Sequence, residues 1–393
     1  MTTPDHWIIR TVDDLCLRVT SGGTPNRSNP EYYEPATIPW VKTGDLTDAF
    51  IRDYGERISE DGVRASSAKV LPPNTVLMAM YGATVGMLGM LIEEATCNQA
   101  ACAMIANPNI CDPRWLFYAL LNDRDFIVSQ ATGAAQQNLS GKTIRQFEYS
   151  TPPLYEQKAI AEILGALDDK IAANTKLVNT ADEWVRAEYD RMANSSDEKR
   201  TIADLVTHRR NAADPALFEV HVPYVGLEHI PRRSMWLATH GTSDEVSSNK
   251  SHFQPGDILF GKLRPYFHKV VTAPKAGICS TDILVLTSIN ETLSGYALAS
   301  LSHDSVVQAV TAASEGTRMP RTSWKDLSNV EVPWPGQIAA ATLSARVQTV
   351  RSFVIGVLSE SQTLAATREA LLPQLMSGNL QVKEAEQVVA TAI

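Results

Sequence analysis

Residues 151–164 read TPPLYEQKAIAEIL, and residues 333–346 read PWPGQIAAATLSAR. In both stretches prolines stop one element, and a run of helix-forming residues follows at once, with Gln157 or Gln337 near its start. Proline interrupts regular structure but is tolerated in the first turn of a helix. The chain therefore ends a folded segment and starts a long helix twice, which indicates two similar halves.

An internal repeat supports the two halves. IPWVKTGDL (38–46) is echoed by VPYVGLEHI (222–230), and LPPNTVLMAMYG (71–82) by FQPGDILFGKLR (253–264). EEATCNQAACAMI (93–105) is likewise echoed by PKAGICSTDILVL (274–286). Leu77 and Leu259 are 182 positions apart, and so are Cys97 and Cys279. Solenoid repeats are far shorter, about 20–50 residues, so this period indicates a duplicated domain.

Each half begins with a region of mixed secondary structure. Short apolar runs such as TVLMAMYG and DILFGKL alternate with Gly, Pro, Asn and Asp, which is typical of strands joined by turns. Residues 112–133 have apolar positions at helical spacing and a proline near the start, so they predict one helix, with a counterpart at 291–313. We therefore expect an α+β fold with two duplicated mixed α/β domains.

The second part of each half predicts a long helix with an apolar seam. Steps of four and three residues give a seam in each copy: Ile160, Leu164, Leu167, Ile171, Asn174, Val178, Ala181 and Val185, then Leu343, Val347, Val350, Val354, Val357, Ser361, Leu364, Arg368, Leu371 and Leu375. Such a seam favours an antiparallel coiled coil of the two helices, with pseudo-two-fold symmetry. Alternatively, each helix packs on its own domain. Asn174 either sets the register of the pair or faces solvent.

Composition limits the class of protein. The 393 residues carry a net charge of −9, which argues against non-specific coating of nucleic acid. The five cysteines show no CxxC spacing, so we expect free thiols in a reducing cytoplasm and no zinc site. MTTPDHWIIR lacks the apolar core of a signal peptide, and the weakly polar run at 81–92 is too short to span a bilayer.

Motifs for catalysis are lacking in the sequence. There is no GxxxxGK[ST] loop and no HExxH motif, and TSGGTPN (20–26) lacks the pattern of a cofactor-binding turn, so we interpret it as an ordinary loop. The two carboxylates of ALDDKI (166–171) fall on the first long helix, where we expect them to face solvent. We therefore expect a protein that is not an enzyme.

The order of these elements resembles the specificity subunit of type I restriction–modification systems. The resemblance rests on IPWVKTGDL, MYGATVG with ATCNQA, NLSGKTIRQFEYSTPPLYEQKAIAEILGALDDKI, and GKLRPYF with GICSTDILVL. LLPQLMSG (371–378) resembles the end of the family's second helix. The block that runs from the prolines into the helix is the most specific of these stretches. The match covers nearly the whole chain.

The resemblance implies a non-catalytic subunit that reads a split DNA sequence with two target recognition domains. It implies docking of two methyltransferase (modification) subunits and of motor–nuclease (restriction) subunits. S-adenosylmethionine, ATP and magnesium are then expected in the partner subunits and not in this chain. The implied division is recognition domain 1 at 1–153, spacer helix 1 at 154–195, recognition domain 2 at 196–335, spacer helix 2 at 336–378 and a tail at 379–393.

The candidate contacts to DNA lie in turns and loops. In the first domain they are Lys42, Thr43, Tyr81, Gln136, Gln137, Asn138 and Lys142, and in the second Lys262, Arg264, Arg318 and Arg321. Amide side chains can bond adenine edges, and Lys or Arg can meet phosphates or guanine. EGTRMPR (315–321) aligns with GAAQQNL (133–139). For each residue, the alternative is a purely structural turn.

Three rival functions remain open at this point. A stand-alone DNA-binding or anti-restriction protein could have the same domains without enzyme partners. A nuclease fused from two copies would need catalytic motifs, which the sequence lacks. A carbohydrate-binding protein would need stripes of aromatic residues, yet aromatic residues make up only 7% of the chain.

Overall fold

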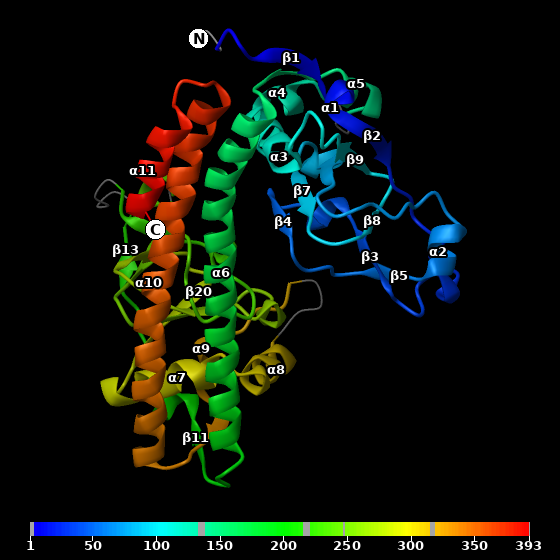
Figure 1. Cartoon of the computed structure of the whole chain (residues 1–393). Coiled ribbons are helices and arrows are strands. Elements are labelled where there is room, and N and C mark those ends of the chain that lie inside the picture. The colour runs from blue at the N-terminus through cyan, green and yellow to red at the C-terminus, as the bar shows by residue number, and fades with distance from the viewer. Residues whose placement is uncertain (1–3, 133–137, 215–220, 247, 315–318, 393) are drawn as a thin grey trace. The chain divides into compact units, whose positions relative to one another are not determined.

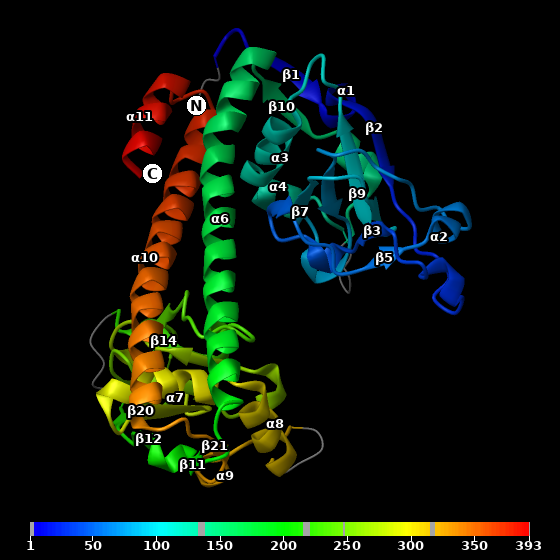
Figure 2. The same ribbon diagram turned by 60° about the horizontal axis from the view of Figure 1, so that its bottom comes forward.

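The computed structural model describes residues 4–132, 138–214, 221–246, 248–314 and 319–392. The chain divides into two units, the first formed by residues 1–171 and 363–393 and the second by 172–362. Two helices of 40 residues each, α6 (Leu154–Ala193) and α10 (Gln337–Met376), contribute one end to each unit (Figures 1 and 2). Both helices begin directly after the proline-rich stretches, as the sequence predicts. The domain limits expected from the resemblance stay a prediction.

The first unit is built on a five-stranded sheet. Its order is β2 (Cys16–Ser21), β9 (Ala101–Ala106), β6 (Val76–Ala79), β7 (Leu88–Leu91) and β4 (Ala49–Ile51). A three-stranded sheet has the order β5 (Arg57–Ile58), β3 (Ile38–Val41) and β8 (Thr96–Cys97), with β3 and β8 parallel. A separate antiparallel pair joins β1 (Ile8–Thr11) to β10 (Glu148–Thr151).

The helices of the first unit differ from the prediction at one place. The single helix expected over 112–133 is two helices, α3 (Pro113–Asn122) and α4 (Arg124–Ser129). Asp123 separates them with φ −95° and ψ 19°, outside the helical range, so the helical hydrogen-bond ladder is interrupted there. The remaining helices of this unit are α1 (Val12–Leu15), α2 (Glu60–Arg64), α5 (Gly141–Arg145) and α11 (Val382–Ala392).

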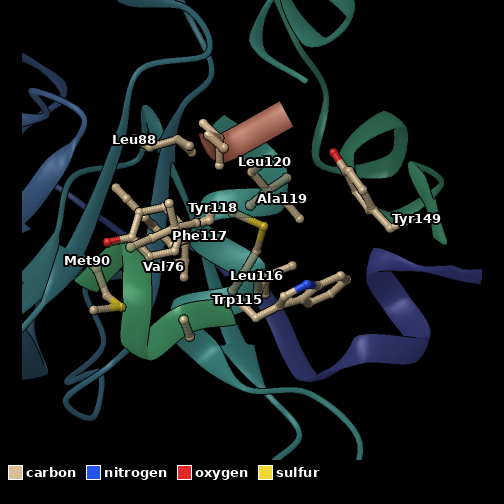
Figure 3. Close-up of a cluster of buried hydrophobic side chains, with 14 of the residues drawn as sticks. Val76, Leu88, Met90, Trp115, Leu116, Phe117, Tyr118, Ala119, Leu120 and Tyr149 are labelled. Atoms are coloured by element: carbon tan, nitrogen blue, oxygen red, sulfur yellow. The ribbon is translucent and has the colours of Figure 1, made fainter. Parts of the chain in front are cut away.

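The core of the first unit lies between the five-stranded sheet and the long helices. Figure 3 shows Val76, Leu88 and Met90 of the sheet beside Phe117 and Tyr118 of α3. Side chains of α6, α10 and α11 join the same core cluster, among them Ile160, Leu164, Leu167, Leu364, Leu371, Ala385 and Val389. The tail after residue 378 therefore contains a packed helix, α11, which the sequence analysis did not predict.

The second unit repeats the strand arrangement of the first. One sheet has the order β12 (Val206–His208), β20 (Ile283–Ser288), β17 (Ile258–Gly261) and β18 (Val270–Thr272), which matches β2-β9-β6-β7. The other has the order β13 (Ala212–Ala213), β16 (Lys250–Phe253), β19 (Gly277–Cys279), β14 (Pro223–Val225) and β15 (Gly241–Thr242). In it, β14 and β19 are parallel, as β3 and β8 are. The predicted duplication is confirmed.

Helices and one strand pair complete the second unit. The region predicted as one helix at 291–313 is again two, α7 (Ser294–Leu301) and α8 (Asp304–Ala313), and α9 (Trp324–Ser328) follows. The pair β11 (Lys199–Thr201) and β21 (Glu331–Pro333) matches β1 and β10. The fold is therefore the expected α+β arrangement of two mixed domains with two long helices.

The seam of the long helices is buried as the sequence predicts. Leu164 and Leu167 of α6 share a core cluster with Leu364 of α10, and Val185 of α6 shares another with Leu343. In each unit one helix therefore contributes its beginning and the other its end, so the two run antiparallel. The clusters also include residues of the sheets, so the helices pack on the mixed domains as well. Both packing modes weighed from the sequence are present.

Polar residues on α6 form specific contacts. Asn174 is 2% exposed and donates to Glu360 at 2.6 Å and to Ser361 at 3.2 Å, so the solvent-facing alternative for Asn174 is wrong. The solvent-facing expectation for the carboxylates of ALDDKI is also wrong for Asp168. Its side chain accepts from Tyr118 at 2.6 Å and from Arg368 at 2.7 Å, because α3 and α10 bring these partners to it. Asp169 is half exposed and pairs with Arg52 at 2.5 Å.

Candidate nucleic-acid interface

A turn directly after strand β6 presents Tyr81 at the surface of the first unit. The short helical turn η3 (Gly82–Thr84) follows, and Tyr81 stays 37% exposed. Tyr81 forms an isolated antiparallel bridge with Asn138. The next residue, Leu139, donates its amide to the carbonyl of Met80 at 2.8 Å and is itself fully buried. The buried leucine therefore fixes the chain next to Asn138 against the end of β6.

Three predicted site residues line one groove of about 510 Å³ in the first unit. They are Tyr81, Asn138 and Lys142. The remaining polar lining comes from Thr20, Ser21, Gln99, Ser140 and Arg145. Amide, hydroxyl and cationic groups together can bond base edges and phosphate oxygens. Gln136 and Gln137 lie outside the described residues.

Lys42 and Thr43 do not line this groove. Lys42 directly follows β3 and precedes a helical turn at Thr43–Asp45, and its ammonium lies 2.5 Å from Glu56, which Arg27 also contacts at 3.0 Å. The hydrogen bond from Lys42 is the main cause that lowers the pKa of Glu56. Because the lysine charge is paired within the domain, Lys42 is a weaker candidate for a phosphate contact than Lys142. Lys142 makes no ion pair among the residues that the structure describes.

The second unit brings three predicted cationic residues together. Strand β17 leads to Lys262 and Arg264, and Arg264 adopts a left-handed conformation with φ 51° before the turn η8 (Pro265–Phe267). Leu263 forms an isolated bridge with Arg321, whose guanidinium pairs with Asp282. Desolvation lowers the pKa of Lys262, so its ammonium is partly withdrawn from water. Arg318 lies outside the described residues.

The two candidate sites use the same construction. In each unit, the second residue after the end of a core strand bridges to a late loop: Tyr81 to Asn138, and Leu263 to Arg321. Next to the bridges, the amide of Leu139 bonds Met80 and that of Thr322 bonds Lys262. The structure therefore pairs Arg321 with Asn138, and the sequence alignment, which set Arg321 against Leu139, is wrong by one residue. The stretch between the bridged residues is one residue longer in the second copy.

Other residues at these sites were missed by the sequence analysis. In the first unit they are Gln99 and Arg145, which reach the groove from β8–β9 and α5. In the second unit Arg232 stacks over Phe267, with its guanidinium carbon 4.0 Å from the ring centroid, beside Arg264 at 5.8 Å. The adjacent basic residues Arg232 and Arg233 could have indicated the second site from the sequence, because such pairs can contact phosphates. For Gln99 and Arg145, only the folded structure shows that they line the groove of the first unit.

The loop at 20–26 brings two backbones together. A Cβ atom on Gly22 would lie 1.8 Å from the carbonyl oxygen of Cys97, and the Gly23 amide donates to that oxygen at 2.9 Å. Glycine is needed here because only a residue without a side chain permits this approach. The interpretation of TSGGTPN as a loop is confirmed for residues 22–26 and wrong for Thr20 and Ser21, which are the last residues of strand β2.

Two other kinds of feature, a metal-binding cluster and a membrane-spanning helix, are absent from the described residues. These residues contain no group of three or more His, Cys, Asp or Glu side chains placed to hold a metal ion. In the same part of the chain, no helix combines the length and apolarity that crossing a membrane requires. All five cysteines are free thiols.

Comparison with known proteins gives one consistent result. Residues 4–182 match the family model of the type I restriction modification DNA specificity domain. The MjaIX specificity subunit of Methanocaldococcus jannaschii is 22% identical over 97% of this chain and 95% of its own length. The EcoDI specificity subunit of Escherichia coli is 33% identical over 23% of this chain and 20% of its own. A crystal structure of a type I system S subunit from M. genitalium superposes with a TM-score of 0.60 at 16% identity, covering 95% of this chain and 98% of that one.

Proposed function

Because residues 4–182 carry a type I restriction modification DNA specificity domain, and the chain is a specificity subunit of that family, we propose that it reads a bipartite DNA site with its two recognition domains. Each mixed domain contacts one half of the site. The first uses the groove around Tyr81, Asn138 and Lys142, and the second uses the turn around Lys262, Arg264 and Arg321.

The observation that supports this proposal is that corresponding β-bridges occur in the two units, between Tyr81 and Asn138 and between Leu263 and Arg321. Duplicated domains that present different side chains at one structural position suit the reading of two different half-sequences. Asn138 can bond an adenine edge. Arg321 pairs with Asp282 but its side chain stays 58% exposed, more than the 35% of the paired Lys42, so its guanidinium can still bond guanine. The same construction with unlike polar residues therefore supports a divided recognition site.

In this proposal the chain itself catalyses no reaction. We assign the reaction to methyltransferase and motor–nuclease subunits that dock on this chain, with S-adenosylmethionine, ATP and magnesium bound by those partners. The long helices α6 and α10 are the proposed docking elements. A cytoplasmic location belongs to the same proposal. A stand-alone DNA-binding or anti-restriction protein is the alternative.

The test is to express the chain with a methyltransferase subunit of its own system and map methylated bases across DNA. We expect one split motif that disappears when this chain is omitted. Binding of the purified chain to DNA with no capture of the methyltransferase subunit would instead favour the stand-alone alternative.

A further inference from the structure

A second polar site of the first unit lies away from the groove described above. A cavity of about 140 Å³ is lined by Trp115, Asp123, Glu148, Tyr149 and Met376. Asp123 and Glu148 also line a groove of about 530 Å³, so the cavity and the groove are adjacent. The site combines α3, β10 and the last turn of α10, all within the first unit.

Two buried donors line this cavity without a partner. The indole Nε1 of Trp115 and the hydroxyl of Tyr149 have no hydrogen-bond partner, although the residues are only 1% and 7% exposed. Figure 3 shows both side chains at one edge of the core cluster, apart from each other. Buried donors are nearly always paired in folded proteins. An occupant of this cavity should therefore provide acceptors.

The rim of the site presents two carboxylates and an apolar surface. Asp123 and Glu148 form no ion pair among the described residues, and burial raises the pKa of Asp123. Phe126 is 51% exposed and packs edge to face on Phe147, with the ring centroids 5.7 Å apart. Two carboxylates repel a phosphate backbone, so DNA does not fit here.

In the second unit, the residue that corresponds to Glu148 already forms an ion pair within the unit. Glu148 is opposite Thr11 in its strand pair, just as Glu331 is opposite Thr201. Glu331 pairs with Lys199 at 3.4 Å. Ile9, which is 70% exposed, occupies the position of Lys199 in the first unit. The first copy therefore has a carboxylate beside an exposed isoleucine where the second copy has an ion pair.

The residue of the second unit that corresponds to Asp123 also has a side-chain partner. His303, which precedes α8 as Asp123 precedes α4, bonds Asp190 of α6 at 2.8 Å. At the same position along α10, the first unit has Pro373, which carries no charge.

The two unpaired donors have no unpaired counterpart either. Tyr296, the third residue of α7 as Trp115 is of α3, donates its hydroxyl to the carbonyl of Pro333. Val332 matches Tyr149 and has no polar group. In the first unit, Trp115 Nε1 and the Tyr149 hydroxyl thus have no partner, and Glu148 forms no ion pair among the described residues. Asp123 has only a hydrogen bond with the side chain of its neighbour Asn122 among the described residues.

We propose that this surface, formed by Trp115, Asp123, Glu148, Tyr149 and Phe126, binds a basic segment of the methyltransferase subunit that docks on the first unit. The inference rests on the proposed function, in which two such subunits bind one chain. A peptide supplies the required chemistry, because its Lys or Arg side chain meets the carboxylates while its main-chain carbonyls accept from the two donors. A polyamine lacks the acceptors. The contact is therefore made by only one of the two methyltransferase subunits.

The experiment uses the full chain co-purified with the methyltransferase subunit of the same system and native mass spectrometry of the complexes. The double variant Asp123→Asn with Glu148→Gln preserves shape and removes both charges. We expect the parent to hold two methyltransferase subunits and the double variant to bind one of them at least about tenfold more weakly, so that 1:1 complexes accumulate. The matched control, Glu331→Gln in the second unit, should retain two.

A photo-crosslinking residue at position 126 provides a second readout that does not depend on folding of the double variant. It should link to a peptide of the methyltransferase subunit that contains Lys or Arg. If the parent and the double variant both hold two subunits with equal affinity, or if position 126 links to a second copy of this chain, the inference is wrong while the proposed function stands. A parent chain that binds no methyltransferase subunit would overturn the proposed function itself.

Discussion

Arg186 of helix α6 donates a hydrogen bond to the main-chain carbonyl of Ser302, with 2.6 Å between Nη1 and the oxygen. The same guanidinium bonds the carbonyl of Arg233 at 3.1 Å and the carboxylate of Asp182 at 3.1 Å. The ring of His268 meets the carbonyl of Ser302 at 2.8 Å, and His268 ends the turn η8 that follows Arg264. Arg186 of helix α6 and His268 therefore bind the same carbonyl, which fixes the turn after Arg264 in the second candidate DNA-contact site.

Replacing Arg186 by Met should destabilise the second unit. Asp182 is only 6% exposed, and the change would leave its carboxylate with the amide of Met235 at 2.8 Å. Removing one partner of a buried ion pair costs about 3–5 kcal/mol. Urea unfolding measures the loss. Arg186→Lys keeps the charge but cannot reach both carbonyls, so we expect an intermediate loss. A loss below about 1 kcal/mol for the methionine variant would contradict this support role.

Asn138→Ala and Arg321→Ala should each relax one half of the recognised sequence. One bidentate base contact contributes about 1–3 kcal/mol of discrimination, so the loss is visible as methylation at additional bases in one half-site. Lys142→Ala is the control, because loss of a phosphate contact weakens binding to all sequences about equally. Methylation-sensitive sequencing compares the three variants. A uniform loss of affinity for Asn138→Ala or Arg321→Ala would show that the residue does not read bases.

The elements predicted best from the sequence are those encoded by local pattern. The prolines at 152–153 and 333–335 and the apolar seams located α6 and α10, because proline and helical periodicity act within a few residues. The shared offset of 182 positions revealed the duplication. The break at Asp123 escaped detection because the apolar spacing continues across it.

Contacts between distant segments could not be predicted in the same way. Asp168 meets Tyr118 and Arg368, 50 and 200 positions away, and only the packed fold brings them together. The pairing of Lys42 with Glu56 is likewise a product of the fold. At the candidate sites, the sequence named the loops, but the one-residue difference between the two bridged stretches became visible only through the bridges.

Gln157→Ala should destabilise the first unit, whereas Gln337→Ala should not. Gln157 is 1% exposed and accepts from the Asp112 amide at 2.8 Å. It also donates to the carbonyls of Ile110 and Pro152, each at 2.9 Å. We expect a loss of about 2–3 kcal/mol, since buried main-chain groups would lose their partners. Gln337 is exposed, so its replacement should change the free energy of unfolding by less than about 0.5 kcal/mol. Equal effects would mean that the two glutamines have one role, as their similar sequence context suggests.

Gly378→Ala and Gly356→Ala should change stability in opposite directions. Gly378 follows α10 with φ +72°, and an added Cβ would lie 2.6 Å from Cγ of Pro4. The end of α10 therefore packs on the start of the chain, as expected for antiparallel helices, and we expect a loss of about 1–3 kcal/mol from backbone strain and this contact.

Gly356 is the matched control for that substitution. It lies inside α10 with nothing within 4 Å of an added Cβ. Alanine there should stabilise the protein by about 0.5–1 kcal/mol, because glycine is the poorer helix former. Urea unfolding of both variants provides the comparison. If Gly378→Ala is as stable as the parent while Gly356→Ala gains, the segment around Pro4 does not pack on α10, and the helix pair does not return the chain to its own start.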